Sequence, residues 1–113
     1  MKLACLVTEK RAEQGLKRQV IAALHTIYDP ELPVNIYDLG LIYALDIDAT
    51  GHVEIRMTLT APGCPVAQSF PALVEQTVVA VRGVAGAHVE IVWEPPWDQS
   101  RMTEAARLEL GLV

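Results

Sequence analysis

Apolar residues recur at helical spacing in two stretches of the chain, residues 10–27 and residues 69–82. The two stripes are Leu16, Val20, Ala23, Leu24 and Ile27, and then Phe70, Leu73, Val74, Thr77, Val78 and Val81. This repeat places the side chains of each stripe on one face, so both stretches are predicted to be amphipathic helices. The second helix is expected to begin near Ser69, because Pro71 fits only in a first turn.

Alternation of apolar with other residues predicts three strands. Residues 41–48 and residues 52–60 flank a turn at residues 49–51 and are expected to form a hairpin with one buried face. A third strand is expected over residues 87–94. The residues expected to share a face are Leu41, Tyr43, Leu45 and Ile47, then Val53, Ile55, Met57 and Leu59, and then Val89, Ile91 and Trp93.

The chain is predicted to continue into a short C-terminal helix over residues 103–110, which begins at Thr103 and is anchored by Leu108. The order is then helix, hairpin, helix, strand and short helix. Elements in this order predict an α+β fold, a two-layer sandwich. With no linker or repeat, residues 1–113 are expected to form a single domain.

Cys64 is the first candidate for chemistry, at the predicted strand-to-helix turn Thr60-Ala61-Pro62-Gly63-Cys64-Pro65. Backbone N–H groups at the start of the next helix would stabilise a thiolate and lower the pKa of Cys64. A helix that begins only near Ser69 weakens this effect. The alternative is that Cys64 is a small buried apolar residue.

Residues 28–40 connect the first helix to the hairpin. They hold two prolines, an asparagine, a glycine and three acids, together with Leu32, Val34, Ile36 and Leu39. This mixture predicts a packed loop that holds its acids in place. Asp29 and Asp38 suit turn or capping roles, bonded to nearby amides. The functional alternative is that Asp29 or Glu31 lies near Cys64, where it tunes the thiol or supplies a hard metal ligand.

The charge of the chain narrows the classes of partner. Nine basic and 14 acidic residues give a formal charge of −5, which argues against nucleic acid and anionic membranes as partners. No apolar run reaches the length of a membrane span, and the apolar start, residues 1–7, is too short for a signal peptide. The protein is therefore expected in the cytoplasm, where its two cysteines are expected to be free thiols.

The histidines and tryptophans are weaker candidates. His25, His52 and His88 lack the spacing of a closed zinc site and are interpreted as surface or helix-end residues. Trp93 is expected to clamp the end of the sheet as a core residue. Trp97 is expected to belong to an exposed aromatic patch that binds a partner protein.

Four motifs in this order resemble the SufT/PaaD family of iron–sulfur assembly domains. They are Asp29-Pro30-Glu31-Leu32-Pro33, Asn35-Ile36-Tyr37-Asp38-Leu39-Gly40-Leu41-Ile42-Tyr43, Met57-Thr58-Leu59-Thr60 leading to Gly63-Cys64-Pro65, and Trp93-Glu94-Pro95-Pro96-Trp97 through Met102 to Ala106-Arg107-Leu108-Glu109-Leu110-Gly111. The resemblance runs from about residue 17 to the C-terminus and is closest to the SufT branch. Residues 1–16 match nothing in the family.

The resemblance implies a compact α/β fold and a role in maturing iron–sulfur proteins. It implies that Cys64 is the reactive cysteine, supported by the acidic loop at Asp29 and Glu31 and by Thr60. Two departures stand out. Ala61 replaces a second threonine found in many relatives, and no cysteine follows Cys64, which argues against the PaaD branch.

These residues lead to a primary hypothesis in which the Cys64 thiolate transiently binds iron or an iron–sulfur cluster and helps to pass it to an apoprotein. A cluster normally takes four protein ligands, so the others must come from elsewhere. The sources are a second subunit, a small thiol, Asp29 or Glu31, or the client. A homodimer is therefore plausible, whereas a stable cofactor and enzymatic turnover are not expected.

Two other classes of function remain open. The first is an adaptor that binds scaffold and client proteins through the Trp97 region and the acidic loop without touching metal. The second is a thiol enzyme with Cys64 as nucleophile, although no base and no resolving cysteine are evident.

Overall fold

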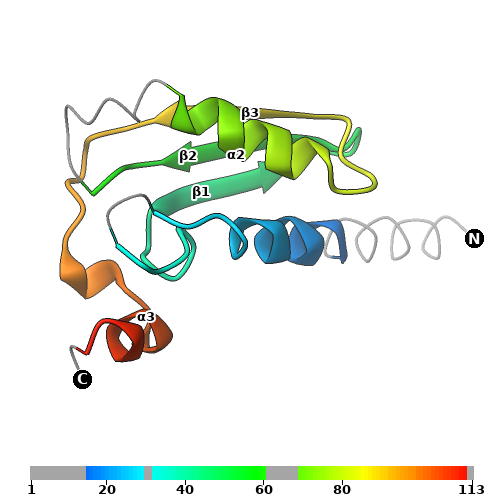
Figure 1. The fold of residues 1–113 in the computed structure, drawn as a ribbon. Helices are drawn as coiled ribbons and strands as arrows, with labels where there is room; N and C mark the ends of the chain where they lie inside the picture. The colour runs from blue at the N-terminus through cyan, green and yellow to red at the C-terminus, as the bar shows by residue number, and fades with distance from the viewer. Residues whose placement is uncertain (1–14, 30–31, 61–68, 112–113) are drawn as a thin grey trace, which may run out of the picture.

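The computed structural model describes residues 15–29, 32–60 and 69–111 of the chain. A helix over residues 15–24 comes first. The later elements are β1 (Ile42–Ile47), β2 (His52–Met57), α2 (Phe70–Val79), β3 (Gly86–Ile91), the 3-10 helix η2 (Gln99–Arg101) and α3 (Glu104–Glu109). Their order confirms the predicted α+β fold (Figure 1). Within these ranges, none of the helices has both the length and the apolar character needed to cross a bilayer.

The sheet has three strands in the order β1-β2-β3. The β1–β2 pair is the predicted antiparallel hairpin, whereas β2 and β3 run parallel, with Val53 opposite Ala87 and Met57 opposite Ile91. A parallel pair needs a crossover connection, which α2 provides between β2 and β3.

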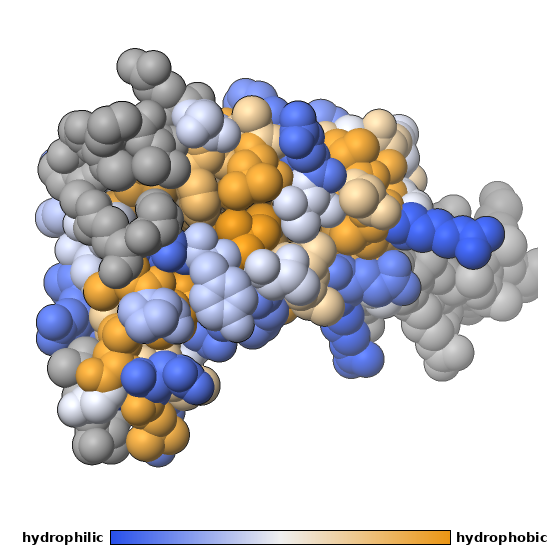
Figure 2. Space-filling view, in the orientation of Figure 1, coloured by the Kyte–Doolittle hydropathy of each residue, from blue (hydrophilic) through white to orange (hydrophobic). Residues whose placement is uncertain are grey.

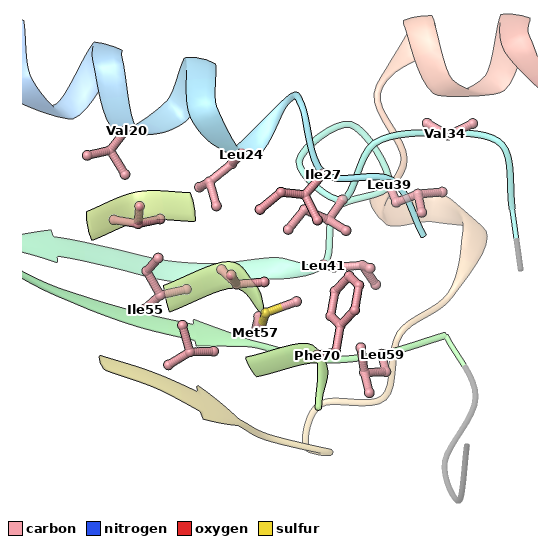
Figure 3. Close-up of a cluster of buried hydrophobic side chains, with 14 of the residues drawn as sticks. Val20, Leu24, Ile27, Val34, Leu39, Leu41, Ile55, Met57, Leu59 and Phe70 are labelled. Carbon is pink, nitrogen blue, oxygen red and sulfur yellow. The ribbon is translucent and has the colours of Figure 1, made fainter. Parts of the chain in front are cut away.

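One face of the sheet and the helices enclose the core. Val53, Ile55 and Met57 on β2 are fully buried, as the alternation predicts. Val20 and Leu24 point from the first helix toward this face (Figure 3). Phe70, Val74 and Val78 of α2 belong to the same cluster, so the helices form one layer and the sheet the other.

The expected alternation fails on β1. The register shifts between Ile42, which pairs with Met57, and Ala44, which pairs with Arg56. A bulge of this kind changes the direction in which the intervening side chain points. Tyr43 therefore leaves the expected apolar row, and its hydroxyl donates a hydrogen bond to the Pro95 carbonyl at 2.8 Å.

Several predicted boundaries and contacts need correction. The first helix ends at residue 24 rather than 27, and α2 ends at Val79 rather than 82. Leu73 was expected on the buried face of the second helix, but 48% of it is exposed. The strand expected to reach residue 60 ends at Met57, and the third strand ends at Ile91 rather than 94.

The C-terminal helix begins as predicted but is anchored differently. The Thr103 hydroxyl accepts a hydrogen bond from the Ala106 amide and caps α3. Leu108, the expected anchor, is 60% exposed. Met102 and Ala106 are buried instead. The chain approaches the core just before α3, so the side of the helix opposite Leu108 faces the core.

Candidate functional site

Cys64 and Glu31 lie outside the residues that the structure describes. The chain is nevertheless fixed on both sides of the Cys64 segment. Leu59 before it and Phe70 after it are buried, and both lie at the same end of the core (Figure 3). Ser69 is the N-cap residue of α2 and Pro71 lies in its first turn, as the sequence predicts. The helix thus starts several residues beyond Cys64, which weakens the expected effect of its N–H groups on the thiol.

Hydrogen bonds continue past the end of β2 and position the approach to this segment. The Thr58 amide donates to the Leu41 carbonyl at 2.9 Å, and the Val92 amide donates to the Met57 carbonyl at 2.8 Å. Thr60, predicted to support the site, is half-buried at the end of this run. A site that Thr60 shares with Asp29 or Asp38 stays a prediction.

The loop before β1 is packed and holds Asp29, as predicted. Asp29 is buried, and its Oδ2 accepts a hydrogen bond from the Leu32 amide at 2.9 Å. The Asp29 amide in turn donates to the Val34 carbonyl at 3.1 Å. These contacts confirm the turn role of Asp29. Its proximity to Cys64 remains a prediction.

Asp38 joins the same loop to the first helix. Its Oδ2 accepts a hydrogen bond from Asn35 Nδ2 at 2.8 Å, and its amide donates to Asn35 Oδ1 at 2.9 Å. Its Oδ1 lies 3.5 Å from His25 Nε2. Neither His25 nor Asn35 was predicted to be a partner of Asp38. The Asn-x-x-Asp spacing was an available signal for Asn35, since such side chains bond locally in turns.

The segment Trp97–Thr103, here called the C-terminal clasp, holds this loop from the other side. Trp97 Nε1 donates a hydrogen bond to the Leu39 carbonyl at 2.7 Å. The Thr103 amide donates to the Asp38 carbonyl at 2.8 Å. The end of the acidic loop is therefore tied to the chain more than fifty residues later.

The two tryptophans exchange their expected roles. Trp93 was expected in the core, but it is 41% exposed. Trp97 was expected on the surface, but it is partly buried against the core and its indole N–H is bonded. The reason is the path of the chain, which leaves the sheet after β3 (Figure 1). Trp97 then lies against the loop before β1, where it reaches the Leu39 carbonyl. Partner binding by Trp97 remains a prediction, with only part of its ring accessible.

We expect Trp97→Phe to destabilise the fold by about 1–3 kcal/mol, because the Leu39 carbonyl loses its donor in a buried position. Trp93→Phe is the matched control and is expected to change stability by less than about 0.5 kcal/mol. Urea unfolding followed by circular dichroism measures both. Equal losses in the two variants would show that the indole hydrogen bond contributes nothing.

The charged side chains on the open face of the sheet form a separate cluster. Glu54 accepts hydrogen bonds from His52 Nε2 at 2.9 Å and from His88 Nδ1 at 3.0 Å. These bonds lower the pKa of Glu54, and Glu54 raises the pKa of His88. Within the described ranges, however, no three His, Cys, Asp or Glu side chains are placed to hold a metal ion.

Comparison with known proteins decides the family. Residues 17–91 match the family described as "Iron-sulfur cluster assembly protein". The chain belongs to this family. The matched region contains the acidic loop, Thr60 and Cys64, and it ends before the C-terminal clasp.

Individual curated proteins are similar to this chain in sequence, and a solved structure is similar to it in fold. A Porphyromonas gingivalis protein named "Fe-S protein maturation auxiliary factor" is 46% identical over 86% of this chain and 92% of its own length. The Staphylococcus aureus "Fe-S protein maturation auxiliary factor SufT" is 35% identical over 76% of this chain and 98% of its own length. A DUF59 crystal structure from Bacillus anthracis superposes with a TM-score of 0.81 at 34% identity, covering 92% of this chain and 99% of that one.

Proposed function

We propose that this iron–sulfur assembly family member is an accessory factor that uses the Cys64 thiolate as a transient ligand during transfer of iron or a cluster to apoproteins. The observation that carries the proposal is the family match over residues 17–91, which includes Cys64, in a chain whose relatives are named auxiliary factors of Fe–S protein maturation. The cluster is the cargo of this protein. It is not a resident cofactor.

The fold fixes the chain on both sides of the segment that carries Cys64. Leu59 and Phe70 are buried on either side of the Cys64 segment, so the chain enters and leaves it at fixed points. Thr60 lies directly at the entry and is proposed to support the thiol by hydrogen bonding. Asp29 and Glu31 are proposed as acidic groups of the same site, and Asp38 as the residue that fixes the loop carrying them.

The ligand count favours transfer over storage. One cysteine supplies one thiolate, whereas a cluster held by protein normally has four ligands. The remaining ligands are proposed to come from a client apoprotein, a scaffold protein, a small thiol or a second copy of this chain. A site shared in this way releases its cargo easily. We place this activity in the cytoplasm and assign it no enzymatic turnover.

Anaerobic reconstitution with iron and sulfide tests the proposal. We expect iron–sulfur absorption and a matching Mössbauer spectrum from the wild type and from Cys5→Ser, and loss of both from Cys64→Ser. Cys5 is the matched control, because it is the other cysteine of the chain and lies outside the family match. Circular dichroism establishes that each variant is folded.

The opposite outcome identifies the alternative function. If folded wild type and Cys64→Ser both lack iron–sulfur absorption, and both support maturation of an added apoprotein by a scaffold equally well, thiolate ligation is wrong. The protein would then be an adaptor between the assembly machinery and its clients.

A further inference from the structure

The outward side of α2 is an exposed and largely apolar surface. It consists of Ala72, Leu73, Gln76 and Val79, together with Ala80, the C-cap residue that follows the helix, and we call it the outer face of α2. Leu73 and Val79 are 48% and 46% exposed, high values for branched aliphatic side chains. Apolar side chains gather over α2 on the side of the molecule shown in Figure 2. The buried side of α2, formed by Phe70, Val74 and Val78, already fills the core.

The outer face of α2 carries no charge, although the whole chain has a formal charge of −5. Glu75 is the one ionisable residue of α2, and its carboxylate accepts a hydrogen bond from the Val89 amide of β3 at 2.9 Å. It therefore points toward the sheet. Depletion of charge is typical of the centre of a protein interface. Two copies of an acidic chain can meet here without placing like charges opposite each other.

The outer face of α2 is also symmetric in sequence about Gln76. Leu73 and Val79 lie three residues before and after it, and Ala72 and Ala80 lie four residues before and after it. In an antiparallel pair of α2 helices related by a two-fold axis at Gln76, Leu73 of each copy meets Val79 of the other. This is the self-complementary pattern that a two-fold interface requires.

The remaining residues of the face suit the same arrangement. A glutamine amide both donates and accepts hydrogen bonds, so Gln76 can pair with its own copy across the axis. Ala72 and Ala80 have small side chains, which permit helices to approach to the lower end of the usual separation of about 8–10 Å. A different partner would have no need for this symmetry.

We propose that the outer face of α2 is the interface of an antiparallel homodimer of this chain. The inference goes beyond the proposed function, because dimerisation through α2 does not rest on Cys64. In an antiparallel pair the two chains enter α2 from opposite ends of the interface.

Sedimentation velocity tests the interface. We expect the wild type to sediment with twice the chain mass of 12.4 kDa, and Leu73→Asp to sediment with the single-chain mass. Leu108→Asp is the matched control, because Leu108 is a 60% exposed leucine on α3, and it should remain dimeric. A monomeric wild type, or a Leu73→Asp variant that remains dimeric, would overturn the proposal.

Disulfide trapping tests the two-fold axis. In a Cys5→Ser/Cys64→Ser background, Gln76→Cys should form a covalent dimer on mild oxidation, because residue 76 faces its own copy. Gln99→Cys, another exposed glutamine, should not. Equal cross-linking of both variants would rule out pairing about Gln76. Iron–sulfur absorption by a monomeric Leu73→Asp variant would separate this interface from the cluster chemistry, so that failure of one proposal leaves the other standing.

Discussion

Gly40→Ala is expected to lower the free energy of unfolding by about 2–5 kcal/mol, a large part of the stability of a small domain. Gly40 has φ of +79°, a conformation that costs an alanine about 1–2 kcal/mol. An added Cβ would also meet the Arg101 carbonyl oxygen at 2.2 Å. That oxygen belongs to the backbone of the C-terminal clasp, so the clasp must move to relieve the contact.

Gly111→Ala separates these two costs. Gly111 has a similar φ of +72°, but an added Cβ would meet nothing within 4 Å. We expect it to cost about 1 kcal/mol, from backbone conformation alone. Urea unfolding gives both values. In a Trp93→Phe background, a fluorescence shift of Trp97 should accompany Gly40→Ala only. Equal destabilisation by the two variants would mean that the C-terminal clasp can move away from the added Cβ without losing stability.

Phe70→Ala is expected to cost about 3–5 kcal/mol, because it leaves a cavity where the core meets the start of α2. Phe70 is 3% exposed and is the first residue of the helix that follows the Cys64 segment. Phe70→Leu keeps most of the apolar volume and should cost about 1–2 kcal/mol. Leu108→Ala, at an exposed leucine, should be close to neutral.

Urea unfolding with an unchanged m-value would assign these losses to the native state. A cost for Phe70→Ala no greater than that of Leu108→Ala would contradict the packing described for Phe70. With Phe70→Leu folded and stable, cluster reconstitution can then be compared with the wild type. This comparison shows how far the Cys64 chemistry depends on a fixed helix start.

Local patterns were sufficient to predict most of the fold. Val53, Ile55 and Met57 alternate with exposed residues and are buried on β2, because a strand with one covered face imposes a period of two. The start of α2 could be placed from Pro71 alone, and the start of α3 from Thr103. Such signals depend only on residues that are close in sequence, so they can be recognised without knowing the tertiary structure.

Features that depend on distant contacts could not be predicted. The bulge at Tyr43 becomes visible only once β1 is aligned with β2. Trp93 and Trp97 have the same side chain, and the return of the chain onto Leu39 decides which one is buried. Helical spacing likewise placed Leu73 on the buried face of α2, although Leu73 is 48% exposed and the buried residues of α2 are Phe70, Val74 and Val78.

The candidate site was predicted less completely than the fold. The packed loop and the turn role of Asp29 could be predicted from the composition of residues 28–40. In a loop that mixes acids and prolines with apolar residues, the acids are expected to form local hydrogen bonds. The approach of His25 to Asp38 could not be predicted in this way, since it depends on how the first helix ends beside the loop.

The parallel pairing of β2 with β3 has a kinetic consequence. Each residue of β2 pairs with a residue 34 positions later, as Glu54 does with His88. Closing a loop of this length costs chain entropy before any pairing compensates for it, so such contacts form late in folding. The hairpin, in contrast, joins residues that are close in sequence. Cys64 lies in the connection between β2 and β3, so we expect a newly synthesised chain to complete its hairpin before β3 pairs with β2.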